Sequence, residues 1–221
     1  MITRFSLYGF LKNQRYYEPF IILFFLSKGL NFAQIGILIS YRELFINISE
    51  IPSGTFADLY GRKKSMVLSL TSYIISFIIF ANSQYFWQFI IALSFFAIGE
   101  AFRTGTHKAM IFTWLRLQNR IDEKNQVYGF TRSWSKLGSA FSIILATIFV
   151  ILSNNYTSVF YYSIIPYLFG LINIITYPKE LDGNPVQKMS LKVITKHLAN
   201  SFKESLKTKK LRRLMIESMG F

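Results

Sequence analysis

Residues 137–178 read LGSAFSIILATIFVILSNNYTSVFYYSIIPYLFGLINIITYP, a run of 42 residues without a charged side chain. A helix needs about 20 mainly apolar residues to cross the hydrocarbon core of a bilayer. The polar run SNNYT at 153–157 divides this stretch near its middle. The stretch therefore predicts two membrane-spanning helices joined by a tight turn.

The rest of the chain up to this stretch has the same character. Residues 65–99 are another 35 residues without a charge, divided by the turn-like NSQ at 82–84, and two earlier apolar stretches are interrupted by charges. We therefore expect an all-α fold, an integral membrane bundle of six transmembrane helices. The helices are expected near 5–27, 34–57, 65–82, 85–112, 130–152 and 158–178.

The composition narrows the function classes. The chain is 52% hydrophobic and 16% charged, whereas soluble domains carry about 25% charged residues. It has no cysteine and two histidines, which leaves no thiolate site and little for a histidine-based metal site. We expect no metal, no cofactor, no catalytic residue and no enzymatic activity.

The net charge of +14 is explained by the orientation of the protein in the membrane. Of the 25 Lys and Arg residues, 21 fall in segments 1–12, 58–65, 108–136 and 179–213. Cytoplasmic loops of membrane proteins carry this excess, so the pattern predicts a multi-pass protein of the cell membrane with a cytoplasmic N-terminus. The basic residues then meet the headgroups of the lipid bilayer, and we expect no nucleic-acid partner.

The chain divides into two parts. Residues 1–178 make up the predicted six-helix bundle, and the DGNP cluster at 182–185 follows its last helix. Residues 179–221 are expected to form a cytoplasmic linker with a basic amphipathic helix, in which Leu191, Ile194, Leu198 and Phe202 share one face. The apolar residues 211–221 predict the start of a seventh helix.

A short motif lies where this topology places the inner turn between the second and third helices. Residues 54–64 read GTFADLYGRKK, which resembles the loop signature of the major facilitator superfamily. The matching positions are Gly54, Ala57, Asp58, Gly61, Arg62 and Lys63, whereas Phe56 and Leu59 depart from the pattern. The resemblance implies the N-terminal six-helix half of a twelve-helix transporter, followed by the inner linker.

The resemblance also implies a conformational latch at this loop, formed by Gly54, Asp58, Gly61 and Arg62. Asp58 and Arg62 are four residues apart and are expected to pair at the inner face. In similar transporters this acid also faces a helix N-terminus in the other half, where the helix dipole favours negative charge. The alternative is a tight turn with an orienting basic cluster.

Charges inside apolar helices are costly and therefore informative. Arg15 and Glu18 lie three apart in the first predicted helix, and Glu100 and Arg103 lie three apart in the fourth. The resemblance implies that these helices line a central cavity, which makes the four residues candidates for substrate or proton contact. The alternatives are neutralisation of each pair within its own helix, or a structural pair between Glu50 and Arg103.

Two further patterns concern helix faces. Glu43, Asn47 and Glu50 share one face of the second predicted helix and are structural or coupling candidates. Gly138, Ser142 and Ala146 recur every four residues, a spacing that predicts close packing between membrane helices.

The resemblance as a whole implies a secondary active transporter that moves an unidentified small molecule by alternating access. One bundle has no partner to move against, so we expect a truncated N-terminal half. Its partner is then the C-terminal half of the same transporter or a second copy. The alternative is a non-transporting six-helix membrane subunit with an assembly or regulatory role.

Overall fold

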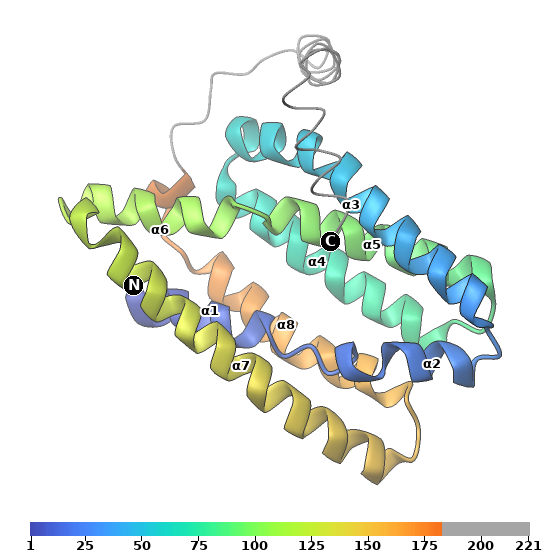
Figure 1. The fold of residues 1–221 in the computed structure, drawn as a ribbon. Helices are drawn as coiled ribbons and strands as arrows, with labels where there is room; N and C mark the ends of the chain where they lie inside the picture. The colour runs from blue at the N-terminus through green and yellow to red at the C-terminus, as the bar shows by residue number, and fades with distance from the viewer. Residues whose placement is uncertain (183–221) are drawn as a thin grey trace.

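The computed structural model describes residues 1–182, which form helices joined by short turns, without a strand in that range (Figure 1). The elements in chain order are α1 (Ile2–Lys12), the 3-10 turn η1 (Glu18–Phe20), α2 (Ile21–Ser27), α3 (Phe32–Tyr60), α4 (Arg62–Asn82), α5 (Phe86–Arg103), α6 (Thr106–Leu117), η2 (Ile121–Glu123), α7 (Lys124–Ser153), α8 (Ser158–Ile175) and η3 (Lys179–Asp182). The prediction of an all-α fold is confirmed. The predicted amphipathic helix and seventh helix lie outside the described residues.

The first predicted helix is not continuous. The chain leaves the helical conformation after Lys12 and resumes as η1 and α2. Pro19 lies in η1, and a proline inside a helix would clash with the carbonyl four residues earlier, here that of Arg15. The prediction of one helix over 5–27 was therefore wrong in its middle, and Arg15 lies in the break.

The fourth predicted helix is also interrupted. Gly105 separates α5 from α6 with a φ of +74°, a conformation that side-chain-bearing residues rarely adopt. An ideal Cβ at Gly105 would have open space around it, so the backbone angle and not the packing requires glycine. The fifth predicted helix has a smaller error at its start. It was expected to begin near residue 130, whereas α7 begins at Lys124.

Six of the helices are neighbours in the order α3, α5, α4, α8, α1 and α7 (Figure 1). The predicted close packing at Gly138 is confirmed, because a Cβ there would lie 2.5 Å from the backbone oxygen of Phe10 in α1. The Gln14 side chain also donates a hydrogen bond to the Gly138 carbonyl at 3.2 Å. Small residues thus bring α1 and α7 together where hydrocarbon supplies no hydrophobic drive.

Buried aromatic rings pack together where α2 meets α4, α5 and α8. The ring centroids of Phe24 and Phe160 are 4.6 Å apart, and those of Phe80 and Phe160 are 4.9 Å apart. Phe25 and Phe89 join the same cluster at 5.2 Å. These contacts connect α2, α4, α5 and α8, so the short helix α2 is held by ring packing and not by its own length.

Four helical segments are long and apolar enough to cross a membrane: Arg62–Asn82, Phe86–Leu117, Ile121–Ser153 and Ser158–Ile175. The helix α3 is not among them, and it carries Arg42, Glu43 and Glu50. Large apolar side chains are exposed along the outer faces of α7 and α8, including Ile144, Ile151, Leu152, Phe169 and Ile172. Such a continuous apolar exterior is suited to contact with lipid.

Candidate functional site

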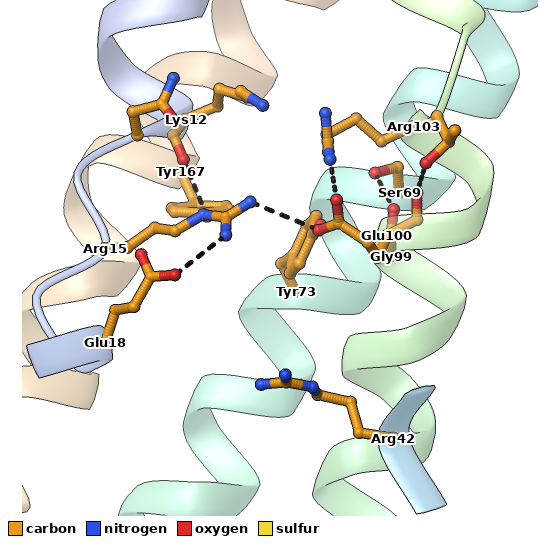
Figure 2. A network of polar contacts seen from close by, with 12 residues as sticks. Lys12, Arg15, Glu18, Arg42, Ser69, Tyr73, Gly99, Glu100, Arg103 and Tyr167 are labelled. Carbon is orange, nitrogen blue, oxygen red and sulfur yellow. Dashed lines mark hydrogen bonds and ion pairs between the residues drawn. The ribbon is translucent and has the colours of Figure 1, made fainter. Parts of the chain in front are cut away.

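Glu100, near the end of α5, is the meeting point of polar and charged side chains from three parts of the chain (Figure 2). One carboxylate oxygen, Oε1, pairs with the Arg103 guanidinium one turn further along the helix. The other, Oε2, lies 3.5 Å from Arg15 Nη2 and accepts a hydrogen bond from the Tyr73 hydroxyl in α4. The break after α1, together with α4 and α5, therefore converges on a single carboxylate.

The Arg15–Glu18 and Glu100–Arg103 pairs are both present, but they differ in their exposure to solvent. Arg15 Nη1 lies 3.6 Å from Glu18 Oε1, yet the Glu18 side chain is 64% exposed. Glu100 is only 17% exposed and Arg103 18%. Exposed ion pairs contribute about 0–1 kcal/mol. The Arg15–Glu100 contact between elements was not predicted, and it joins residues 85 positions apart.

In the buried part of this cluster the two guanidinium groups outnumber the carboxylates, because Glu18, the second carboxylate beside Arg15, is exposed. Glu100 provides one carboxylate for Arg15 and Arg103, and the Nε atoms of both arginines are buried without a hydrogen-bond partner. The hydroxyls of Tyr8 and Tyr17 are likewise buried without a partner. Unsatisfied buried donors favour the uptake of an acceptor group. The cluster therefore suits a site that binds or exchanges charged groups.

Two cavities flank the cluster. The first, which we call the mixed-charge cavity, has a volume of about 560 Å³ and lies between the α1–α2 segment, α3 and α5. The second, the basic pocket, has about 350 Å³ and lies between α1, the α5–α6 junction and α7. Glu100 and Arg15 line the first, and Arg103 and Lys12 line the second. The Glu100–Arg103 pair is thus the boundary between two differently charged spaces.

The three polar residues predicted on one face of α3 line the mixed-charge cavity together. Glu43 pairs with Arg42 at 2.5 Å, and the Asn47 side chain donates to the Glu43 carbonyl at 3.0 Å. Glu50 forms no ion pair within residues 1–182. Of the two alternatives for Arg103, the pair with Glu50 is absent from the described residues, and Arg103 pairs with Glu100 one turn away on its own helix.

The loop motif has a different arrangement from the one predicted. Gly61 adopts a φ of +96° and separates α3 from α4, which places Asp58 and Arg62 on different helices. Arg62 Nη1 donates to the Thr113 hydroxyl at 2.6 Å, and exposed Asp58 has no ion pair within the described residues. The predicted Asp58–Arg62 pair was therefore wrong, and Asp58 is available to another partner.

A carboxylate from the segment after α8 binds the first turn of α4. Asp182 Oδ1 accepts a hydrogen bond from the Lys63 backbone N–H at 2.6 Å, and Lys63 Nζ donates to the Tyr177 carbonyl at 2.9 Å. A Cβ on Gly61 would lie 3.0 Å from the Asp182 carboxyl carbon. Gly61 thus permits a close approach, whereas a Cβ on Gly54 would meet nothing within 4 Å in the described structure.

Sequence patterns missed two contributors to the site. Tyr73 lies in a charge-free stretch, and nothing in its neighbours indicates a polar role. Lys12 was counted only as an orienting residue, although it lines the basic pocket. Each belongs to the site because of helices that approach from distant parts of the chain.

Comparison with known proteins agrees with this architecture. The family model of the Major Facilitator Superfamily matches residues 10–216. The uncharacterized MFS-type transporter YxaM of Bacillus subtilis (strain 168) is 31% identical over 99 residues, which are 45% of this chain and 24% of that protein.

Solved structures share the fold at low identity. A bacterial homologue of the human drug peptide transporters PepT1 and PepT2 superposes with a TM-score of 0.70 and 18% identity, over 98% of this chain and 53% of that one. Tetrameric PepTSo2 gives a TM-score of 0.71 and 18% identity, over 98% and 51%. The chain therefore spans about half the length of these structures. The predicted resemblance is confirmed: the chain belongs to the major facilitator superfamily.

Proposed function

We propose that this chain is one half of a secondary active transporter, which moves a small solute across the cell membrane by alternating access. In this proposal residues 1–178 form six spans, with the N-terminus in the cytoplasm. The second half is supplied by the remainder of the same protein or by a second copy. Family membership and the superposition on about half of each transporter structure support the proposal.

The observation that carries the proposal is the position of Glu100. Its carboxylate pairs with Arg15 through one oxygen and with Arg103 through the other, between the mixed-charge cavity and the basic pocket. A proton on Glu100, or an anionic group on Arg15, weakens these pairs. Binding in one cavity is thereby coupled to the geometry of the other, which alternating access requires.

Glu18, Glu43, Asn47 and Glu50 have supporting roles in this mechanism. All four line the mixed-charge cavity, and Glu18 and Glu50 are exposed. Carboxylates that are not fully paired can accept a proton or a cationic group of the solute. At the loop, exposed Asp58 is proposed to meet the N-terminal end of a helix in the other half, which makes it the latch.

The proposal is tested with the intact protein in proteoliposomes, using a panel of amino acids, short peptides, sugars and organic acids. Glu100→Gln keeps the side-chain size and an acceptor for Tyr73 but removes the charge. Hydrogen bonds to charged groups contribute about 1.5–3 kcal/mol, so we expect uptake to fall about tenfold or more. The control is Glu123→Gln, which breaks the exposed Arg120–Glu123 pair of the same spacing.

A charge exchange separates a substrate role from a structural role. The double variant Glu100→Arg with Arg103→Glu retains a local ion pair but moves the positive group. Normal membrane insertion with lost uptake supports contact with the solute. Recovered uptake removes Arg103 from the candidate site, and an intact protein that moves no member of the panel favours the non-transporting subunit.

A further inference from the structure

The basic pocket contains cations without a counter-charge. Its lining includes Lys12 from α1, Arg103 from α5, Lys108 from α6, and Arg132 and Lys136 from α7, and it includes no Asp or Glu. The mixed-charge cavity, by contrast, has four carboxylates among its lining residues, which are Glu18, Glu43, Glu50 and Glu100. The positive charge therefore accumulates on one side of the Glu100–Arg103 pair.

Apart from Arg103, these cations have no acidic partner elsewhere in the described chain. Lys12, Lys108, Arg132 and Lys136 form no ion pair within residues 1–182. The Lys108 ammonium lies over the rings of Phe112 and Tyr128, at 5.6 Å and 5.1 Å from their centroids. Arg103 alone has a carboxylate, and that carboxylate also holds Arg15. Within residues 1–182 the repulsion between the cations is therefore offset only in part, by the rings beside Lys108 and by the shared carboxylate of Glu100.

Orientation of the protein does not explain this convergence. To orient the protein, basic residues need only lie in the cytoplasmic segments, and they need not be close to one another. Arg116, Arg120 and Lys124 lie in the same stretch of sequence and do not line the pocket. The pocket instead gathers cations from four helices around one space, with Arg132 and Lys136 exposed and Lys12 half-buried.

We propose that the basic pocket binds a phosphate or carboxylate group. Arginine guanidinium groups match both anions through paired N–H donors, and lysines add point charges. The volume of about 350 Å³ is at the small end of ligand sites, which fits a headgroup or a small organic anion. The anion comes from solution or from the headgroup of an anionic lipid. The inference concerns binding and does not depend on transport.

The test is lysine footprinting of the intact protein in nanodiscs. An amine-reactive reagent labels accessible lysines, and mass spectrometry compares labelling with and without inorganic phosphate in phosphatidylcholine nanodiscs. We expect phosphate to protect Lys12, Lys108 and Lys136. The controls are Lys64 and Lys124, which are exposed and do not line the pocket, and they should stay equally labelled.

Variants and lipid composition complete the test. Arg132→Gln and Lys136→Gln each remove an exposed cation from the pocket and should weaken phosphate binding about tenfold. Lys124→Gln, on the same helix, should leave it unchanged. Protection that needs phosphatidylglycerol and no phosphate identifies the lipid headgroup as the anion.

The outcomes remain separate from those of the transport experiment. Equal labelling of pocket and control lysines under every condition, with unchanged binding in the variants, overturns the proposed anion site. Such a result leaves the transporter proposal intact if uptake is observed. Selective protection without uptake of any solute supports the anion site and contradicts the transporter.

Discussion

The two cavities of this bundle share a wall but differ in chemistry. The mixed-charge cavity combines carboxylates, Arg15 and Arg42 with aromatic rings, whereas the charged residues of the basic pocket are all cations. A single ion pair, Glu100–Arg103, separates them. Carboxylates therefore lie on one side of this pair, and cations without an ion pair in the described residues lie on the other. A change at the Glu100 carboxylate alters the lining of both cavities.

The largest expected contrast concerns the side of the membrane that each region faces. Residues 1–221 contain no cysteine, so a cysteine introduced into them is the single thiol of this part of the protein. Asn82→Cys should react with an impermeant thiol reagent from outside, and Gln118→Cys should react only after the membrane is opened. Both positions are exposed. The reverse pattern would contradict the predicted cytoplasmic side for the turn after α6.

The next prediction concerns the contact between α1 and α7, two helices that line the basic pocket. Gly138→Ala places a Cβ 2.5 Å from the Phe10 carbonyl and must push α1 and α7 apart. Overpacking costs about 1–3 kcal/mol, so the intact protein should unfold at a lower temperature. Gly129→Ala on the same helix meets nothing within 4 Å and is the matched control. Equal stability of the two variants would show that the close approach is not required.

A smaller effect is expected at the wall itself. Tyr73→Phe removes the hydrogen bond to the Glu100 carboxylate, and bonds to charged groups contribute about 2 kcal/mol. Tyr41→Phe removes the 2.7 Å contact with the Ser94 hydroxyl, a neutral bond of about 1 kcal/mol. Denaturant titration of both variants measures the difference. A larger loss in Tyr41→Phe would argue against a charge-assisted bond at Glu100.

The smallest effect on stability is expected at the loop. Asp58→Asn changes an exposed carboxylate without an ion pair in the described residues, so the unfolding free energy should shift by less than about 0.5 kcal/mol. Uptake by the intact protein should nevertheless fall, because the proposed latch needs the charge. Unchanged uptake would leave this loop as an orienting turn.

Several features could be predicted from local sequence. Charge-free stretches of suitable length predicted the positions of α4, α8 and most of α5 and α7, because every backbone polar group must be satisfied within a helix in hydrocarbon. Spacing of three residues predicted the Glu100–Arg103 pair, since such neighbours lie on one helix face, and it predicted the Arg15–Glu18 pair although Arg15 lies outside a helix. The breaks at Arg15 and Gly105 were missed, although Pro19 and Gly105 carried the signal.

The sequence by itself determined the helical class, the positions of most helices and the family signature at 54–64, because hydropathy, helix period and turn residues act over short distances. Only the tertiary structure decided the partners of the charges. Glu100 meets Arg15 across 85 positions, Asp182 contacts the start of α4, and Lys12 lies near α7 cations. Such contacts depend on how whole helices pack, and local spacing holds no information about the order in which helices become neighbours.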